Sequence, residues 1–112
     1  MSDLKKATEA LVKFRDERHW QQFHNTKDLA LALSIEAAEL NELFLWKTNE
    51  EAEMTDREKL KEELADVFAY ALLLAEKHKL DVTEIVLEKV VKNGIKYPVD
   101  KSKGSATKYN KL

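Results

Sequence analysis

Apolar residues recur every three or four positions along most of this chain, which is the spacing of one face of an α-helix. The pattern predicts four helices, over about residues 3–18, 29–46, 56–79 and 82–96. The two glycines and the single proline, Gly94, Gly104 and Pro98, all lie near the C-terminus, so no strong helix breaker interrupts the first 93 residues. We therefore expect an all-α fold, a four-helix bundle.

Polar residues with capping chemistry stand before three of the predicted helices. Asn25 or Thr26 is expected to cap the second helix. Thr55 has the spacing of a capping box with Glu58, and Asp81 stands in the same relation to the residue three positions later. Residues 50–54 are expected to form a loop.

The chain divides into a helical domain of residues 1–98 and a tail of residues 99–112 that is rich in lysine and serine and is expected to be loop-like. Such a tail either covers a site or only keeps the end of the chain soluble. The apolar stripe from Val67 to Ala75 is wider than one neighbouring helix covers, which favours an oligomer, a homodimer or a homotetramer.

Composition narrows the classes of partner. The formal net charge of −2 in 112 residues gives no global attraction to nucleic acid or to anionic membranes. No apolar run approaches the roughly 20 residues of a membrane span, and the N-terminal residues lack the apolar core of a signal peptide. The absence of cysteine excludes disulfides and thiolate metal sites and fits a cytoplasmic protein.

Two pairs of acids interrupt the apolar stripes of the second and third predicted helices, Glu36 with Glu39 and Glu63 with Asp66. Residues three apart share a helix face, so packing of the two stripes would bring four carboxylates together. Two like charges about 6 Å apart repel by roughly 3 kcal/mol at an effective dielectric near 20. Either a cation or protonation must relieve that repulsion.

A solvated helix surface is the ordinary explanation for a single pair of this kind, but the apolar context of these pairs favours a metal site. No Glu-x-x-His motif occurs, so the di-iron carboxylate pattern is not matched. Oxygen ligands alone indicate Mg²⁺, with Mn²⁺ as a substitute. Because Mg²⁺ sites of this kind complete their coordination with substrate phosphates, phosphoryl or nucleotidyl chemistry is the natural hypothesis.

Aromatic and basic residues offer places for a nucleotide. Trp20, Trp46 and Tyr70 present flat faces on which a base can stack, and His24 can donate to a base or phosphate; core or rim packing is the alternative for each. Phosphates have a candidate row at spacings of four and three on the fourth helix, formed by Lys89, Asn93 and Lys96. Favourable placement near a helix C-terminus explains such lysines equally well.

Five stretches of the chain together match a known family: RDERHWQQFH at 15–24, EAAELNELFLW at 36–46, EELADVFAY at 62–70, KYPV at 96–99 and SKGSA at 102–106. With them the chain resembles the MazG-like all-α nucleoside triphosphate pyrophosphohydrolases, most closely their dCTP pyrophosphatase branch. The resemblance covers nearly the whole chain. It implies a helical bundle assembled as a dimer or a tetramer.

The resemblance also implies a Mg²⁺-dependent enzyme that cleaves a dNTP, with dCTP or a modified dCTP as the best guess, to the monophosphate and pyrophosphate. By the same implication the four acids hold the metal, the three aromatic residues and His24 line the base pocket, and the lysine row serves the phosphates. Leu11 departs from the pattern of the dCTP branch, which has a histidine there, so cytosine preference is open. A broader NTP or dNTP pyrophosphatase, or a catalytically silent helical module that binds a nucleotide or a protein, are the alternatives.

Overall fold

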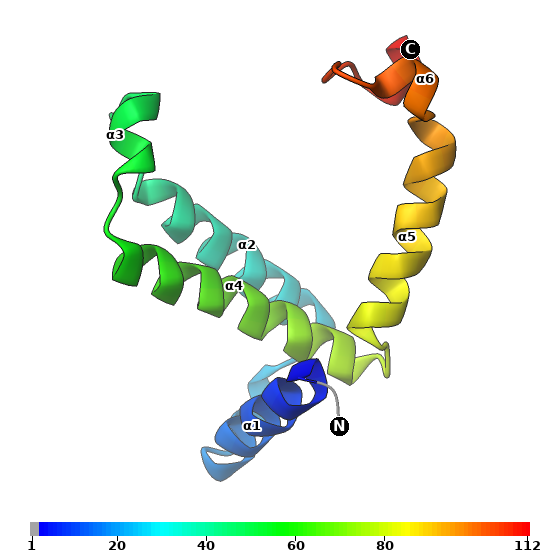
Figure 1. The fold of residues 1–112 in the computed structure, drawn as a ribbon. Helices are drawn as coiled ribbons and strands as arrows, with labels where there is room; N and C mark the ends of the chain where they lie inside the picture. Colours follow the sequence, from blue (N-terminus) through cyan, green and yellow to red (C-terminus); the bar gives the residue numbers. More distant parts are fainter. Residues whose placement is uncertain (1–2) are drawn as a thin grey trace. The chain divides into compact units, whose positions relative to one another are not determined.

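The computed structural model describes residues 3–112, and among them it contains helices, turns and no strand. This confirms the predicted all-α class. The long helices are α1 (Asp3–Glu17), α2 (Thr26–Glu42), α4 (Arg57–Lys77) and α5 (Val82–Lys96) (Figure 1). The short ones are η1 (Trp20–Phe23), α3 (Asn49–Glu53), α6 (Val99–Ser102) and η2 (Tyr109–Lys111). The chain forms two compact units, one ending at Lys79 and the other running from Leu80 to Leu112.

The first unit is organised around the pair α2 and α4, which run antiparallel and side by side with α3 between them in the chain (Figure 1). Helix α1 contacts α4. Buried apolar side chains concentrate where the start of α2 meets the C-terminal half of α4: Leu29 is 1% exposed, and Leu72, Leu73 and Ala75 are also buried. The opposite half of the helix pair is only partly buried, and that half carries the acids.

Helix α2 begins where the sequence predicts and ends earlier. Asn25 is its N-cap, and its side chain accepts a hydrogen bond from the backbone N–H of Asp28 at 2.9 Å. The predicted end near Trp46 is wrong, because α2 ends at Glu42 and residues 43–46 form turns. The N–H groups of residues 43–45 bond to carbonyls three residues back, so the backbone tightens while the apolar spacing continues.

A short helix replaces the loop expected at residues 50–54. Thr48 and Glu51 form a capping box at the start of α3, with both hydrogen bonds at 3.2 Å. The predicted cap at Thr55 is also wrong: Asp56 caps α4 by accepting from the N–H of Glu58, and the Thr55 hydroxyl is buried without a hydrogen-bond partner. Thr and Asp both suit the N-cap position, and Asp is the stronger N-cap of the two.

The second unit consists of α5 and the tail. Asp81 caps α5 as predicted, accepting from the N–H of Glu84 at 3.0 Å. The tail is less loop-like than expected, because α6 and η2 lie within it. Tyr109 of the tail packs edge-on against Tyr97, with ring centroids 6.0 Å apart, so the tail folds back on the end of α5. The division into a domain of residues 1–98 and a tail stays a prediction.

Within residues 3–112, none of the helices combines the length and the apolar character that crossing a membrane requires.

Replacing Asn25 tests whether its side chain stabilises the start of α2. We expect Asn25→Ala to lower the free energy of unfolding by about 1 kcal/mol, since it leaves the Asp28 N–H without its side-chain acceptor. Urea denaturation of the purified variant measures the change. Asn41→Ala, an exposed position inside α2, is the matched control and should be neutral or slightly stabilising. Equal losses in both variants would contradict the cap.

Candidate metal centre and adjoining pocket

Three carboxylates converge between α2 and α4. Glu36, Glu39 and Glu63 each place one carboxylate oxygen so that all three atoms lie within 4.8 Å of one another. Glu36 and Glu63 are half-buried, and Glu39 is exposed. Helical spacing puts the first two on one face of α2, and the antiparallel packing of α4 brings the third opposite them. The predicted convergence of the two helices is therefore present for these three acids.

The carboxylates are close enough to disturb one another's ionisation. The pKa of Glu36 is raised to about 7, first by a hydrogen bond with Glu39 that only the protonated acid can donate, then by burial and by the charges of Glu39, Asp66 and Glu63. Burial raises the pKa of Glu63, and the charges of Glu39 and Asp66 add to it. The cluster thus carries more negative charge than the protein neutralises by itself.

The donor set fits a hard divalent cation. Glu36 Oε2 and Glu63 Oε2 are both buried with no hydrogen-bond partner, so each keeps a free acceptor position. Carboxylate oxygens are the ligands that Mg²⁺ and Mn²⁺ take. Asp66 lies outside the set of three, one turn beyond Glu63 on α4, although its charge reaches both Glu36 and Glu63.

A largely apolar cavity of about 620 Å³ adjoins the acids. Helix α1 and the first residues after it form one wall, and α4 forms the other. Its polar lining is limited to Arg15, His24, Asp66 and the hydroxyl of Tyr70. Its apolar lining is supplied by Ala7, Ala10, Leu11, Phe14, Trp20, Ala65, Phe68, Ala69, Leu72 and Leu73. A mostly apolar cavity with a few converging polar groups is typical of a small-molecule site.

Tyr70 and His24 connect this cavity to the carboxylates. The pKa of Tyr70 is raised by burial and by the charges of Glu36, Asp66 and Glu39, so its hydroxyl lies in the negative field of the acids. The Tyr70 ring meets the His24 ring edge-on at 6.5 Å. Burial, and then the positive charge of Arg15, lowers the pKa of His24, while its Nδ1 atom is buried without a hydrogen-bond partner. A neutral imidazole therefore faces the cavity.

Trp20 reaches the same cavity from η1. The turn after α1 places His19 in the left-handed region at φ 54°, and the chain then reverses so that Trp20 packs edge-on against Phe14 with ring centroids 5.8 Å apart. Trp20 remains 44% exposed. Three of the predicted base-pocket residues, Trp20, His24 and Tyr70, thus line one cavity together with Asp66.

Trp46, the fourth predicted base-pocket residue, lies apart from that lining. Its side chain is 93% exposed, and its backbone has φ 64°, a conformation that a bulky side chain rarely adopts. The ring therefore makes little contact within the first unit.

The predicted phosphate residues all belong to α5 in the second unit. Lys89 and Asn93 are exposed there, with Lys96 one turn further on. Lys96 Nζ stands 4.9 Å from the centroid of the Tyr109 ring, a cation–π contact with the tail.

The prediction from sequence missed Arg15, which is 8% exposed and lines the cavity. Its position was a usable signal, because Arg15 follows Leu11 by four residues and so falls on the apolar stripe of α1. A charge on an apolar stripe was the same signal that identified the acids.

The fold and this site define an all-helical protein whose paired helices present a carboxylate cluster beside an apolar ligand cavity. Residues 31–112 match the model of the MazG-like family, and the chain belongs to that family. The acids and Tyr70 fall within the matched stretch.

Individual relatives agree with this assignment. The chain is similar to dCTP pyrophosphatase 1 of Bos taurus, 43% identical over 106 residues, and to that of Homo sapiens, 40% identical over 106 residues. The alignments take in 90% of this chain and 63% and 62% of those proteins, so the chain spans less than two thirds of their length. The crystal structure of a pyrophosphatase from Archaeoglobus fulgidus superposes with a TM-score of 0.81 at 35% identity, covering 88% of this chain and 94% of that one.

The raised pKa of Glu36 predicts a pH-dependent gain on removing its charge. In the unfolded chain the Glu36 carboxyl loses its proton at about pH 5, near its ordinary pKa. In the folded, metal-free protein the same carboxyl keeps its proton up to about pH 7. The carboxyl therefore destabilises the fold increasingly as the pH rises from about 5 to about 7. We expect Glu36→Gln to raise the Tm of metal-free protein, more at pH 8 than at pH 5. Thermal melts at constant ionic strength measure this difference.

Addition of Mg²⁺ should reverse the order at pH 8, since only the ionised wild-type cluster gains stability from the cation. A Tm difference between Glu36→Gln and wild type that stays constant with pH would contradict the raised pKa of Glu36.

Proposed function

We propose that this chain is a Mg²⁺-dependent nucleoside triphosphate pyrophosphohydrolase that cleaves a dNTP, with uptake of one water, to the dNMP and pyrophosphate. Such an activity removes unwanted nucleotides from the pool. The observation that carries the proposal is the convergence of Glu36, Glu39 and Glu63 beside a cavity of about 620 Å³ that is lined by Asp66, Tyr70 and aromatic rings. A triphosphate needs both of these parts, a cation site for its phosphates and an apolar slot for its base.

The four acids hold the metal in this proposal, with Asp66 completing the set from the next turn of α4. Mg²⁺, or Mn²⁺ in its place, supplies neutralisation of the polyphosphate and orientation of the attacking water when bound. The chain's own contribution is to hold one carboxylate oxygen each of Glu36, Glu39 and Glu63 within 4.8 Å of one another before substrate arrives.

The base occupies the cavity between α1 and α4. Trp20 and Tyr70 offer ring surfaces for stacking, and the unpartnered Nδ1 of His24 offers a polar contact. Trp46 is the remaining candidate for the base site; its ring lies apart from the cavity lining and is 93% exposed, so it is available to a ligand. Lys89, Asn93 and Lys96 of α5 serve the phosphates.

Cytosine is the proposed base, because the relatives in cattle and man are named dCTP pyrophosphatases. The cavity of this chain carries Leu11 at its wall, a side chain without hydrogen-bonding groups. Discrimination among bases must therefore come from the remaining polar groups. A broad dNTP pyrophosphatase is the second candidate, favoured by the same apolar lining, and a panel of all dNTPs and NTPs separates the two.

Assembly as a homodimer or homotetramer belongs to the same proposal. Large apolar side chains are exposed on both units: Ile35 is 59% exposed, Phe68 56%, Val91 67% and Ile95 79%. Exposure on this scale is typical of faces that another subunit covers. A catalytically silent module with these faces would bind partners too, but its stability would respond little to Mg²⁺ and it would release no pyrophosphate.

Loss of one carboxylate tests the metal role. We expect Asp66→Asn to reduce pyrophosphate release from dCTP by at least about 100-fold at saturating Mg²⁺, as transition-state charge stabilisation at metal sites is worth several kcal/mol. Pyrophosphate release across a panel of dNTPs and NTPs is the measurement, and circular dichroism checks that helicity is retained.

Glu58→Gln is the matched control and should leave the rate unchanged, because Glu58 is an exposed acid on the same helix that pairs with the exposed Lys61. If the wild-type protein is inert toward every triphosphate in the presence of Mg²⁺ and of Mn²⁺, the proposed enzymatic activity is refuted.

Trp46 offers a test that separates binding from folding. We expect Trp46→Gly to raise the KM for dCTP about tenfold, by loss of stacking. The free energy of unfolding should stay within about 1 kcal/mol of wild type, because the ring is 93% exposed and glycine tolerates φ 64°. Met54→Ala, at another exposed apolar residue, should leave KM unchanged. An unchanged KM in Trp46→Gly would remove this ring from the base site.

A further inference from the structure

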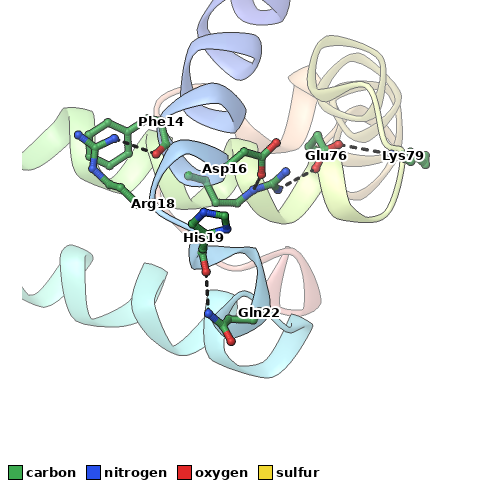
Figure 2. Close-up of polar contacts among 8 residues, drawn as sticks. Phe14, Asp16, Arg18, His19, Gln22, Glu76 and Lys79 are labelled. Carbon is green, nitrogen blue, oxygen red and sulfur yellow. Dashed lines mark hydrogen bonds and ion pairs between the residues drawn. The ribbon is translucent and has the colours of Figure 1, made fainter.

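Among the described residues, Arg15 is the buried charged side chain, 8% exposed, and it ties two helices together. Its Nε donates to Asp16 Oδ1 at 2.8 Å, and its Nη1 donates to Glu76 Oε2 of α4 at 3.4 Å. Glu76 in turn pairs with Lys79 at 3.4 Å. Figure 2 shows Asp16 and Glu76 at the ends of these contacts, with Lys79 beyond. A guanidinium between two carboxylates has a defined orientation because its donors form a rigid fork.

Arg15 is also part of the wall of the cavity. Arg15 lines that cavity together with Trp20 and His24 from the segment that follows α1, and with Asp66 and Tyr70 from α4. The cavity lies between α1 and α4, so the spacing of these helices sets its width. The ion pair between Arg15 and Glu76 joins the last turn of α1 to the last turn of α4. The two residues lie sixty-one positions apart in the chain.

The same turn of α1 also sets the direction of the segment that carries the cavity's rings. The N–H of Arg18 bonds to the carbonyl of Arg15, and the N–H of His19 bonds to that of Asp16, after which the left-handed His19 reverses the chain into η1. The side chain of Arg15 thus binds to α4, while its backbone carbonyl accepts the first hydrogen bond of the turn that leads to Trp20.

We propose that Arg15, held by Asp16 and Glu76, is a positioning residue that fixes the Trp20 and His24 wall of the cavity against α4 and thereby determines how tightly a base is bound. The inference rests on the proposed function and deepens it. Arg15 touches neither the carboxylate cluster nor, in this proposal, the phosphates. Its charge further favours the neutral form of His24, because a cation beside an imidazole opposes protonation.

Arg15→Met keeps the length of the side chain and removes both ion pairs. We expect the KM for dCTP to rise about tenfold with kcat within about twofold of wild type, since only ground-state binding of the base is disturbed. The concentration of Mg²⁺ that gives half the thermal stabilisation should be unchanged. Arg15→Lys, which retains one cationic donor, should recover part of the KM. Arg57→Met, the same change at an exposed arginine of α4, is the matched control and should leave KM unchanged.

Glu76→Gln provides a second variant in case Arg15→Met does not fold, and it should raise KM in the same direction by a smaller factor. A purely structural tie would lower Tm in both variants and leave KM unaltered in the folded protein, which would overturn the inference. A fall in kcat at unchanged KM would overturn it as well, because it would assign Arg15 to the reacting phosphates. Wild-type protein without pyrophosphate release instead refutes the proposed function itself, so the two failures are distinguishable.

Discussion

Negative charge held between two helices is the constraint on which the rest of this structure depends. At one end of the α2 and α4 pair the helices pack through the buried side chains of Leu29, Leu72 and Leu73. The antiparallel register that follows places Glu36 and Glu39 opposite Glu63. Apolar packing at one end therefore drives carboxylates together at the other. The hydrogen bond with Glu39, burial and the neighbouring negative charges together raise the pKa of Glu36 to about 7, and two carboxylate oxygens keep unpaired acceptor positions. A cation is the partner that relieves both conditions at once.

The cavity shares its elements with the acid cluster. Helix α4 carries Glu63, Asp66 and Tyr70 on successive turns, so a single rigid element spans from the carboxylates to the ring that meets His24. Helix α1 supplies the other wall and is fixed to α4 through the buried guanidinium of Arg15. Sites built on rigid helices hold their side chains before a ligand binds, which reduces the cost of binding.

Much of this architecture was predictable from the sequence, because helical periodicity and few breakers are local signals. The acid pairs were identified since charge on an apolar stripe is anomalous, and the same rule applied to Arg15 would have found it. The end of α2 was mispredicted because the apolar spacing continues past Glu42 while the backbone tightens, and the helix at residues 49–53 was missed although Thr48 and Glu51 cap it. The cap at Asp56 was mispredicted because neighbouring Thr and Asp residues compete for the same backbone donors. The pairing of Arg15 with Glu76 spans 61 residues, and such contacts follow from packing that no local pattern specifies.

The central claim is that the carboxylates between α2 and α4 hold the metal of a bound triphosphate. The most direct test is a crystal structure with Mn²⁺ and a nonhydrolysable α,β-imido analogue of dCTP, with the metal located by its anomalous scattering. The account predicts an anomalous peak ligated by Glu36, Glu39, Glu63 and Asp66, and a base between Trp20 and Tyr70. A bound analogue whose metal peak lies away from these carboxylates, or an analogue bound with its base outside the cavity, would contradict it.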